Sequence, residues 1–309
     1  MTSAGDTAAW AGAQGVVLVS HGTVDGLDDL AAFVTNVRRG KPPGPEMLAE
    51  LRRRYEAIGG RSPLNATTAE LARKLAQRLG VRVEWANRLW RPYVRDVLAE
   101  LAASGVKRVA VVPLAPFSAH VYEADARRAA EGLSLELECA PGWGLNPSLV
   151  AAFARRIDAE LRRGEALGPP HLLMTAHSLP VAVIERGDPY EREVRSAAKE
   201  VATEVSRRAG TRVSWSLAFQ SQGFAEGGMR WLGPDLRAAI DAVPARAHLV
   251  VAAIGFLADH VETLYDLDVE AAALARDRGL SFARAASLDA DDDLVDVLAE
   301  VARLRLRHG

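Results

Sequence analysis

The sequence predicts an α/β protein of two halves, each a mostly parallel sheet flanked by helices, with a cleft between the halves. Short apolar runs alternate with longer polar stretches of helical pattern along the whole chain, as in successive βα units. The chain has 309 residues, more than one hydrophobic core usually supports. The series of elements also repeats. We therefore place the halves at residues 1–145 and 146–309.

The first half is expected to alternate strands with helices. Its apolar runs predict strands at 16–19, 81–85, 108–114 and 135–139. Helices are expected at 27–37, at 46–57, from a cap at Thr67 or Thr68 to residue 79, and at 92–103. The second of these helices ends at Gly59-Gly60, because glycine readily adopts the left-handed conformation of a helix C-cap.

The second half repeats this plan. Its strands are expected at 172–175, 213–218, 249–254 and 282–285. Helices are expected at 147–163, after Asp188-Pro189-Tyr190, directly after the third strand, and at 291–306.

Composition excludes several classes of protein. The net charge of −2 gives no reason to expect nucleic acid or an anionic membrane as a partner. Cys139 is the single cysteine, so one chain forms neither a disulfide nor a cysteine-ligated iron–sulfur cluster. No apolar run approaches the ~20 residues of a membrane helix, and the N-terminus has no signal-peptide pattern. We expect a cytoplasmic protein without an integral membrane segment.

Histidines occur at corresponding strand ends of the two halves. The segment VLVS-His21 matches LMTA-His177, and His120 in SAHVYE matches His260 in ADHVET. Ligands of parallel α/β sheets bind at the carboxyl ends of the strands. If the two halves face each other, these four histidines and Glu262 surround one cleft.

Three carboxylates follow the last of these histidines at helical spacing. Glu262, Asp266 and Glu270 are four residues apart, which stacks them on one face of an α-helix. Like charges at this spacing disfavour an isolated helix by roughly 0.2–0.5 kcal/mol per pair. Such a row is suited to receive or pass a divalent cation, and the alternative is a solvated acidic face.

Four sequence blocks resemble ferrochelatases, and the resemblance runs from end to end. The blocks are RYEAIGGRSPL from Arg54, AHSLP from Ala176 with GDPY from Gly187, WLGPD from Trp231, and GFLADHVETLYD from Gly255. The stretch from Arg38 to Gly60 is most similar to the coproporphyrin III ferrochelatases of Gram-positive bacteria.

The resemblance implies a fold and a set of site residues. It implies two Rossmann-like, chelatase-type halves, with His177 and Glu262 as the catalytic pair at the iron. It also implies that Arg38, Arg54, Tyr55 and Ser62 line the porphyrin pocket, with Arg88 at the position of a basic residue of the family. Tyr55 either stacks on the porphyrin or fills the core.

The chemistry of metal insertion suits these residue types. A porphyrin must lose two pyrrole protons to accept Fe²⁺, and a neutral imidazole is the natural base at neutral pH. We assign His177 to proton abstraction or metal contact and Glu262 to metal binding or proton transfer, since imidazole and carboxylate both suit ferrous iron. Asp266 and Glu270 extend this path toward solvent. His260 is expected to have a supporting structural role.

The basic residues suit an anionic substrate. Coproporphyrin carries four propionates, and Arg38, Arg39 and Arg54 can pair with them through charge-assisted hydrogen bonds. The alternative is a solvated basic loop. His21 stands where Gram-positive relatives tend to have tyrosine, so we expect it near the porphyrin as a candidate axial ligand of the iron.

The sequence thus favours a ferrochelatase, a lyase of haem biosynthesis that inserts Fe²⁺ into coproporphyrin III. Protoporphyrin IX as the substrate, a chelatase for cobalt or sirohydrochlorin, and a non-catalytic tetrapyrrole-binding protein are the alternatives. No cofactor is expected beyond Fe²⁺, which is a substrate. Transient contact with neighbouring haem-pathway enzymes is left open.

Overall fold

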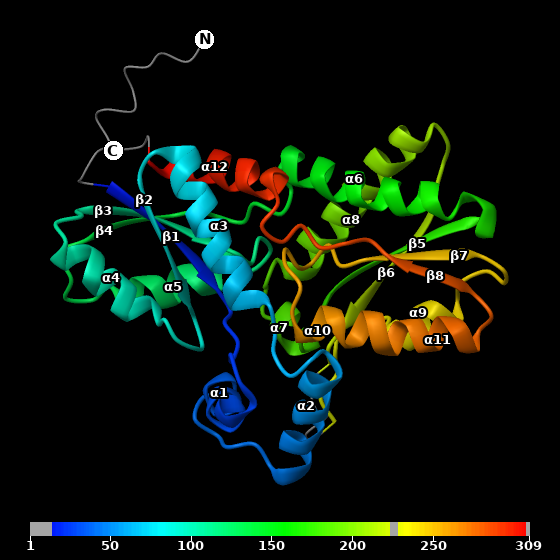
Figure 1. Cartoon of the computed structure of the whole chain (residues 1–309), viewed down its shortest axis with the longest axis horizontal. Coiled ribbons are helices and arrows are strands. Elements are labelled where there is room, and N and C mark those ends of the chain that lie inside the picture. Colours follow the sequence, from blue (N-terminus) through cyan, green and yellow to red (C-terminus); the bar gives the residue numbers. More distant parts are fainter. Residues whose placement is uncertain (1–13, 223–227, 307–309) are drawn as a thin grey trace. The chain divides into compact units, whose positions relative to one another are not determined.

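The protein is described here by a computed structural model covering residues 14–222 and 228–306 (Figure 1). Residues 1–13 of the predicted first half and 307–309 of the predicted second half lie outside the described residues. The described chain forms two compact units, each with a four-stranded parallel sheet. The α/β fold class predicted from the sequence is confirmed.

The first sheet has the strand order β2-β1-β3-β4. Its strands are β1 (Gln14–Ser20), β2 (Arg82–Asn87), β3 (Arg108–Pro113) and β4 (Glu136–Cys139). The helices of this unit are α1 (Leu30–Val37), preceded by a 3₁₀ turn at Leu27–Asp29, α3 (Leu64–Leu79), α4 (Val94–Ala103), α5 (Ala119–Ala129) and α12 (Asp292–Leu306). In Figure 1, α3 and α12 cover one face of the sheet, and α4 and α5 cover the other.

The second sheet repeats this order as β6-β5-β7-β8. Its strands are β5 (Pro170–His177), β6 (Ser214–Gln220), β7 (His248–Ala252) and β8 (Ser281–Arg284). The longer helices are α2 (Pro45–Ala57), α6 (Pro147–Arg163) and α8 (Tyr190–Ala209). The shorter ones are α7 (Val181–Glu185), α9 (Leu236–Asp241), α10 (Val261–Leu264) and α11 (Ala272–Asp277), with a 3₁₀ turn at Glu165–Leu167 and a π-helix, η4, at Asp266–Ala271. Each strand of the first sheet has its counterpart four strands later.

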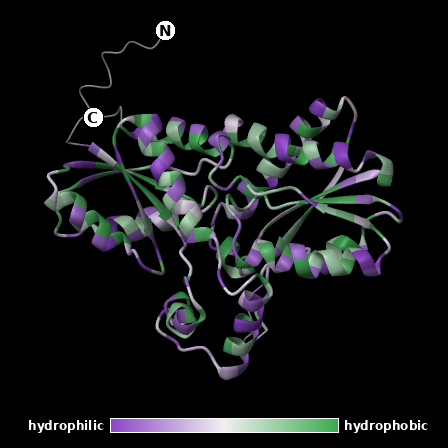
Figure 2. Cartoon of the chain, viewed as in Figure 1, coloured by the Kyte–Doolittle hydropathy of each residue, from purple (hydrophilic) through white to green (hydrophobic). Residues whose placement is uncertain are grey.

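The central strands are the most completely buried elements of each unit. Figure 2 shows both hydrophobic and hydrophilic residues on the helices and on the outer strands, whereas the sequences of the central strands are mostly apolar. Residues Val16 to Val19 of β1 and Leu172 to Met174 of β5 are fully or almost fully buried. Both faces of each sheet are covered by helices, which is why the central strands read as continuous apolar runs.

The compact units do not follow a single cut of the chain at residue 145. Residues 45–61 group with the second sheet, and residues 289–306 group with the first. The last helix, α12, packs on α3 and β3 and buries the apolar face that includes Leu294, Leu298 and Val301. An amphipathic helix is stabilised wherever this face is covered, so its position along the chain did not reveal its unit.

Two helical details differ from the sequence-based expectations. The helix expected to begin at Thr67 or Thr68 starts earlier, at Leu64 after Pro63, and the Thr68 hydroxyl donates instead to the Leu64 carbonyl at 2.7 Å. The helix expected after β7 is not uniformly α-helical, because η4 interrupts it. In η4 the Glu270 amide donates to the carbonyl of Tyr265, five residues back, at 3.0 Å.

None of the helices in the described part of the chain combines the length and the apolar character needed to span a lipid bilayer.

Candidate active site

His177 and Glu262 lie together in the second unit, at the carboxyl ends of β5 and β7. His177 is the last residue of β5, and Glu262 lies in the first turn of α10. The loop after β7 passes directly over β5 at Gly255, whose amide donates to the Thr175 carbonyl at 3.0 Å. A Cβ atom at residue 255 would lie 2.6 Å from the Cα of Ala176, so glycine is required for this approach.

The Glu262 carboxylate is flanked by two imidazoles. His177 Nε2 lies 3.6 Å from Glu262 Oε1, and His260 Nε2 lies 3.5 Å from Glu262 Oε2. The Nδ1 atoms contact backbone carbonyls, those of Ser178 and Ala258. A carbonyl only accepts hydrogen bonds, so the Nδ1 of His177 carries a proton and its Nε2 is the basic nitrogen facing the carboxylate. The His260 side chain also accepts from the Thr263 backbone amide, so its contacts do not fix its tautomer in the same way.

Burial and charge act in opposite directions on this cluster. Burial by itself would lower the pKa of the His177 imidazole, but the charge and hydrogen bond of Glu262 more than offset it, and the pKa is raised. Burial would likewise raise the pKa of Glu262, but His177 and His260 hold that pKa well below its usual value. The side chains of His177 and Glu262 are still 36% and 34% exposed, so a substrate can reach them.

Three further contacts hold the pair in place. The buried Tyr190 hydroxyl donates to the His177 carbonyl at 2.9 Å. Gln220, the last residue of β6, pairs with His177 in the sheet register, and its Nε2 donates to the Glu262 carbonyl at 2.9 Å. The Phe256 ring contacts both imidazoles, at centroid distances of 6.5 Å to His177 and 4.7 Å to His260.

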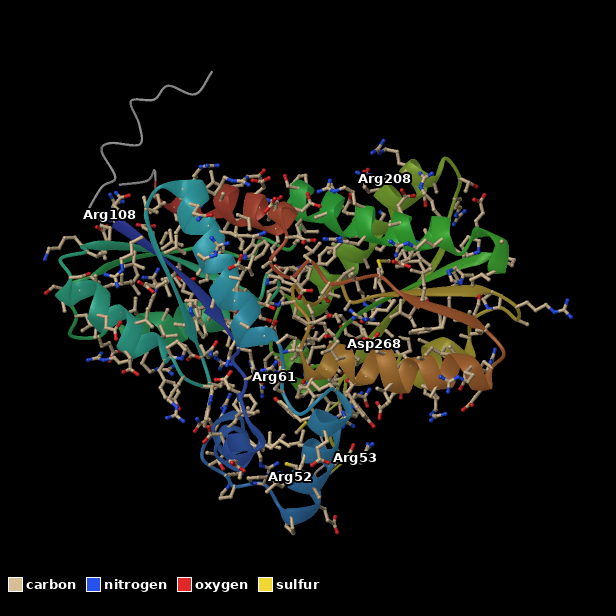
Figure 3. All side chains as sticks on the ribbon, viewed as in Figure 1. Arg52, Arg53, Arg61, Arg108, Arg208 and Asp268 are labelled. Atoms are coloured by element: carbon tan, nitrogen blue, oxygen red, sulfur yellow. The ribbon has the colours of Figure 1, made fainter. Side chains whose placement is uncertain are left out.

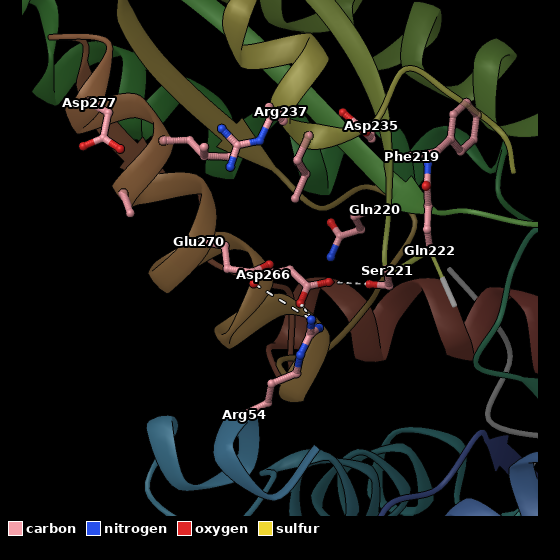
Figure 4. Close-up of a pocket in the computed structure, with 13 residues that line it drawn as sticks. Arg54, Phe219, Gln220, Ser221, Gln222, Asp235, Arg237, Asp266, Glu270 and Asp277 are labelled. Atoms are coloured by element: carbon pink, nitrogen blue, oxygen red, sulfur yellow. Dashed lines mark hydrogen bonds and ion pairs between the residues drawn. The ribbon is translucent and has the colours of Figure 1, made fainter. Parts of the chain in front are cut away.

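Asp266 and Glu270 line a pocket of about 440 Å³ together with Arg54, Gln220 and Ser221 (Figure 4). Asp266 accepts a hydrogen bond from the Ser221 hydroxyl at 2.6 Å and pairs with Arg54 Nη1 at 3.1 Å. Glu270 Oε1 lies 3.9 Å from Arg54 Nη2. Burial raises the pKa of Asp266 to about 6, despite the lowering effect of the Ser221 hydrogen bond.

Arg54 is surrounded by acidic and aromatic partners. Besides Asp266 and Glu270 it pairs with Glu50 at 2.8 Å, and its guanidinium lies over the Tyr265 ring, 5.0 Å from the centroid. Its neighbour Arg53 donates to the Tyr265 hydroxyl at 2.5 Å. The guanidinium predicted to bind a propionate is therefore held by carboxylates in this structure.

The remaining predicted residues have varied surroundings. Tyr55 is buried in α2, while Ser62 is buried and its hydroxyl accepts from the Leu64 amide at 3.4 Å. Arg88 is paired with Asp125, and its guanidinium lies over the Tyr122 ring. Three of the predicted residues lie at or near the surface of the first unit. They are His21, directly after β1, and Arg38 and Arg39, at the end of α1.

No group of three or more histidine, cysteine, aspartate and glutamate side chains within residues 14–222 and 228–306 has the arrangement of a metal-binding cluster. His177 with Glu262 therefore stays a predicted contact of a passing ion.

Sequence reasoning missed Tyr190, Gln220 and Ser221 as parts of the site. The last two lie where β6 ends, and polar residues at the carboxyl end of a parallel strand were the available signal. Tyr190 gave no such signal, because its hydroxyl contacts a backbone carbonyl.

Comparison with known proteins assigns a family to this arrangement. Residues 13–306 match the family model described as Ferrochelatase. A ferrochelatase of Acidobacterium capsulatum is 34% identical, over 93% of each chain. A coproporphyrin III ferrochelatase of Anoxybacillus flavithermus is 34% identical, over 95% of this chain and 96% of that protein. The structure of SirB from Bacillus subtilis with Fe³⁺ is similar in fold, with a TM-score of 0.57, 12% identity and 96% of each chain covered.

Proposed function

This chain belongs to the ferrochelatase family, and on that premise we propose that its porphyrin substrate is coproporphyrin III. It is a lyase of haem biosynthesis that inserts iron into a porphyrin. The observation that carries the substrate proposal is the charge of residues 38–61. This stretch holds seven arginine or lysine residues and three glutamates.

A basic stretch suits coproporphyrin better than protoporphyrin because the number of carboxylates differs. Coproporphyrin has four propionates, and guanidinium groups bind carboxylates through paired, charge-assisted hydrogen bonds. Arg39, Arg52, Arg53 and Arg61 are exposed, and the last three are labelled in Figure 3. The coproporphyrin III ferrochelatase of Anoxybacillus flavithermus covers almost the whole chain, which supports the same choice.

We assign the deprotonation of the porphyrin to His177. Insertion exchanges two pyrrole protons for one Fe²⁺. His177 Nε2 is the basic nitrogen of a side chain that is 36% exposed and therefore accessible to a substrate. The imidazolium that forms is stabilised by the Glu262 carboxylate 3.6 Å away. Glu262 also offers an oxygen ligand to the arriving ion.

Asp266 is placed to carry the released protons toward solvent. Its pKa of about 6 lets it gain and lose a proton near neutral pH. The guanidinium of Arg54 lies 3.1 Å away and repels a cation, which favours proton transfer over metal binding at this residue. Glu270, in the same pocket, continues the path.

Anaerobic metal-insertion assays test the substrate. Fe²⁺ and Co²⁺ are offered with coproporphyrin III, protoporphyrin IX and sirohydrochlorin, and initial rates give kcat/KM for each combination. We expect the highest value for Fe²⁺ with coproporphyrin III. A higher value with protoporphyrin IX or sirohydrochlorin would reject the proposed substrate.

A pair of variants tests the basic stretch. Arg39→Gln and Arg53→Gln should each raise KM for coproporphyrin III more than for protoporphyrin IX. Arg208→Gln, in the last turn of α8, is the matched control, since it removes an arginine outside residues 38–61. Equal effects of all three variants on both porphyrins would remove this support.

A further inference from the structure

Arg284 bridges two carboxylates on either side of the segment that carries Glu262. It is the last residue of β8, paired with Val251 of β7 in the parallel register. Its Nη1 and Nη2 donate to Asp259 Oδ1 and Oδ2 at 2.9 and 3.1 Å. Its Nε donates to Asp268 Oδ1 at 2.6 Å. One guanidinium thus ties the loop before α10 to the π-helix after it.

The bridge is sheltered and reinforced. The Arg284 side chain is only 12% exposed. Asp259 Oδ1 also accepts from the Ser287 hydroxyl at 2.6 Å, and Ser287 is itself buried. A two-pronged arginine–carboxylate pair with little solvent is stronger and more directional than an exposed ion pair. The planar guanidinium therefore fixes the positions of both Asp259 and Asp268, whereas a lysine ammonium would attract them without fixing their orientation.

The bridged segment needs such support because its backbone is unusual. A π-helix is rare and is frequently found at functional sites. Here η4 joins the four-residue helix α10 to the six-residue helix α11, so the regular α-helical hydrogen-bond pattern is interrupted just after the turn that carries Glu262. Asp268, labelled in Figure 3, lies in η4 and is the point at which the bridge reaches it.

We propose that Arg284 is a positioning residue, which sets the course of residues 259–268 and so holds the Glu262 carboxylate between the two imidazoles. This inference rests on the proposed role of Glu262. Arg284 does not touch the reacting atoms. It acts by keeping the Glu262 oxygens at the distances of 3.6 and 3.5 Å that they have from His177 and His260.

The size of the expected effect follows from the tolerance of catalytic geometry. A misplacement of about 1 Å by a change far from the reacting atoms can reduce the rate by about 100-fold. Loss of the partners that orient a metal-binding side chain typically costs about 10- to 100-fold in activity. Arg284→Gln should therefore lower kcat for Fe²⁺ insertion by about 10- to 100-fold.

The experiment compares a graded set of variants in the full-length chain. Arg284→Gln removes both arms, Arg284→Lys keeps the charge but not the fork, and Asp268→Asn weakens one arm. Arg278→Gln is the matched control, since that arginine pairs with Asp241 and not with residues 259–268. Each protein is assayed for kcat and KM with Fe²⁺ and coproporphyrin III. Amide hydrogen exchange is measured in peptides covering residues 260–271.

Arg284→Gln should show reduced kcat, a KM for porphyrin within about twofold of wild type, and faster exchange in residues 260–271. Arg284→Lys and Asp268→Asn should fall between it and wild type, and Arg278→Gln should match wild type. Should Arg284→Gln fail to fold, Asp268→Asn decides by the same readouts.

Wild-type kcat in Arg284→Gln, or exchange as slow as in wild type, would overturn the proposal. An equal loss of kcat in Arg278→Gln would overturn it too, because the effect would then be general. Glu262→Ala is included to separate the two claims. If Glu262→Ala keeps wild-type turnover, the proposed role of Glu262 is wrong, and the exchange measurement alone then decides whether Arg284 fixes the segment.

Discussion

In the first unit, His120 is followed two residues later by Tyr122, and in the second unit His260 is followed by Glu262. The two sheets have the same strand order, and both histidines follow the third strand of their half. Tyr122 is buried and its ring lies against the Arg88 guanidinium, whereas the Glu262 carboxylate lies 3.6 Å from the His177 imidazole and 3.5 Å from that of His260. The second unit thus has a carboxylate where the first has a buried tyrosine, and on the proposed function this carboxylate makes its strand end the reactive one.

The residues that end β2 and β6 are both amides, but their hydrogen-bond partners differ. Asn87, fully buried at the end of β2, donates to Asn65 and to the Arg91 carbonyl, which ties loops and a helix together. Gln220, at the end of β6, donates to the Glu262 carbonyl. The longer amide side chain reaches the helix that carries the carboxylate. The residue that ends β6 therefore contacts the segment that carries Glu262, whereas the residue that ends β2 contacts loops and a helix of its own unit.

The largest expected effect is on turnover. His177→Ala should lower kcat/KM for Fe²⁺ insertion by about 100- to 10,000-fold, because it removes the proposed base. His120→Ala, in the first turn of α5 and matching His260 of the second unit, should stay within about twofold of wild type, as expected for an exposed side chain. Anaerobic initial rates measure both. A His177→Ala enzyme of near-normal activity would remove the proposed asymmetry between the units.

The absorption spectrum of the product complex tests the role of His21 in the first unit. It corresponds in the chain to His177, and it is a candidate axial ligand of the product iron. His21→Ala should change the absorption spectrum of the enzyme–product complex while the apo enzyme keeps its fold. An identical spectrum in the variant and wild type would exclude His21 from the iron.

A smaller effect is expected on stability at Asp266. Its pKa is raised to about 6 from a usual 3.8, so the folded protein binds this proton more tightly than the unfolded chain. This contribution to stability is complete below pH 3.8 and is lost as the pH rises through about 6. Asp266→Asn should therefore raise the free energy of unfolding at pH 8 by up to about 3 kcal/mol, since each pKa unit corresponds to about 1.4 kcal/mol.

Denaturant unfolding at pH 8 and pH 4 measures this difference. The gain should disappear at pH 4, where wild-type Asp266 is already protonated in the folded state. A variant that is less stable than wild type at pH 8 would show that the ion pair with Arg54 outweighs the burial of the charge.

The smallest expected effect is at Tyr190. Tyr190→Phe leaves the buried His177 carbonyl without this donor and should lower the free energy of unfolding by about 1–2 kcal/mol. Tyr93→Phe, in the first unit, is the control, since the Tyr93 hydroxyl accepts a hydrogen bond from the half-buried Asn36. Denaturant unfolding of both variants measures the difference, and an unchanged value for Tyr190→Phe would show that this hydrogen bond contributes nothing net.

The sequence predicted the strands well because their signal is local. The eight predicted strands all form, with ends that differ by at most two residues. The helix α5 was not predicted, because the stretch after β3 begins with Ala115-Pro116 and reads as a loop. The placement of α12 on the first sheet depends on contacts far along the chain, which no local pattern contains.

The site was predicted in part for the same reason. His177, Glu262, Asp266 and Glu270 follow from motifs and spacing. In the structure His177 lies 3.6 Å from Glu262, and Asp266 and Glu270 line one pocket. The π-helix was not predicted, since carboxylates four residues apart fit an α-helical face equally well. The pairing of Arg54 with Asp266 and of Arg284 with Asp259 was also missed, because both join residues distant in sequence.

The pH dependence of kcat tests the His177–Glu262 pair most directly. A base that must be neutral to accept a proton gives a rate that falls at low pH, with a midpoint at its pKa. Because Glu262 raises the pKa of His177 above 6.5, the wild-type midpoint should lie above that value. Glu262→Gln removes the charge and leaves burial, which lowers the pKa, so its midpoint should move to lower pH along with a reduced maximal rate. An acidic midpoint that stays unchanged in Glu262→Gln would contradict the pairing of these residues in the reaction.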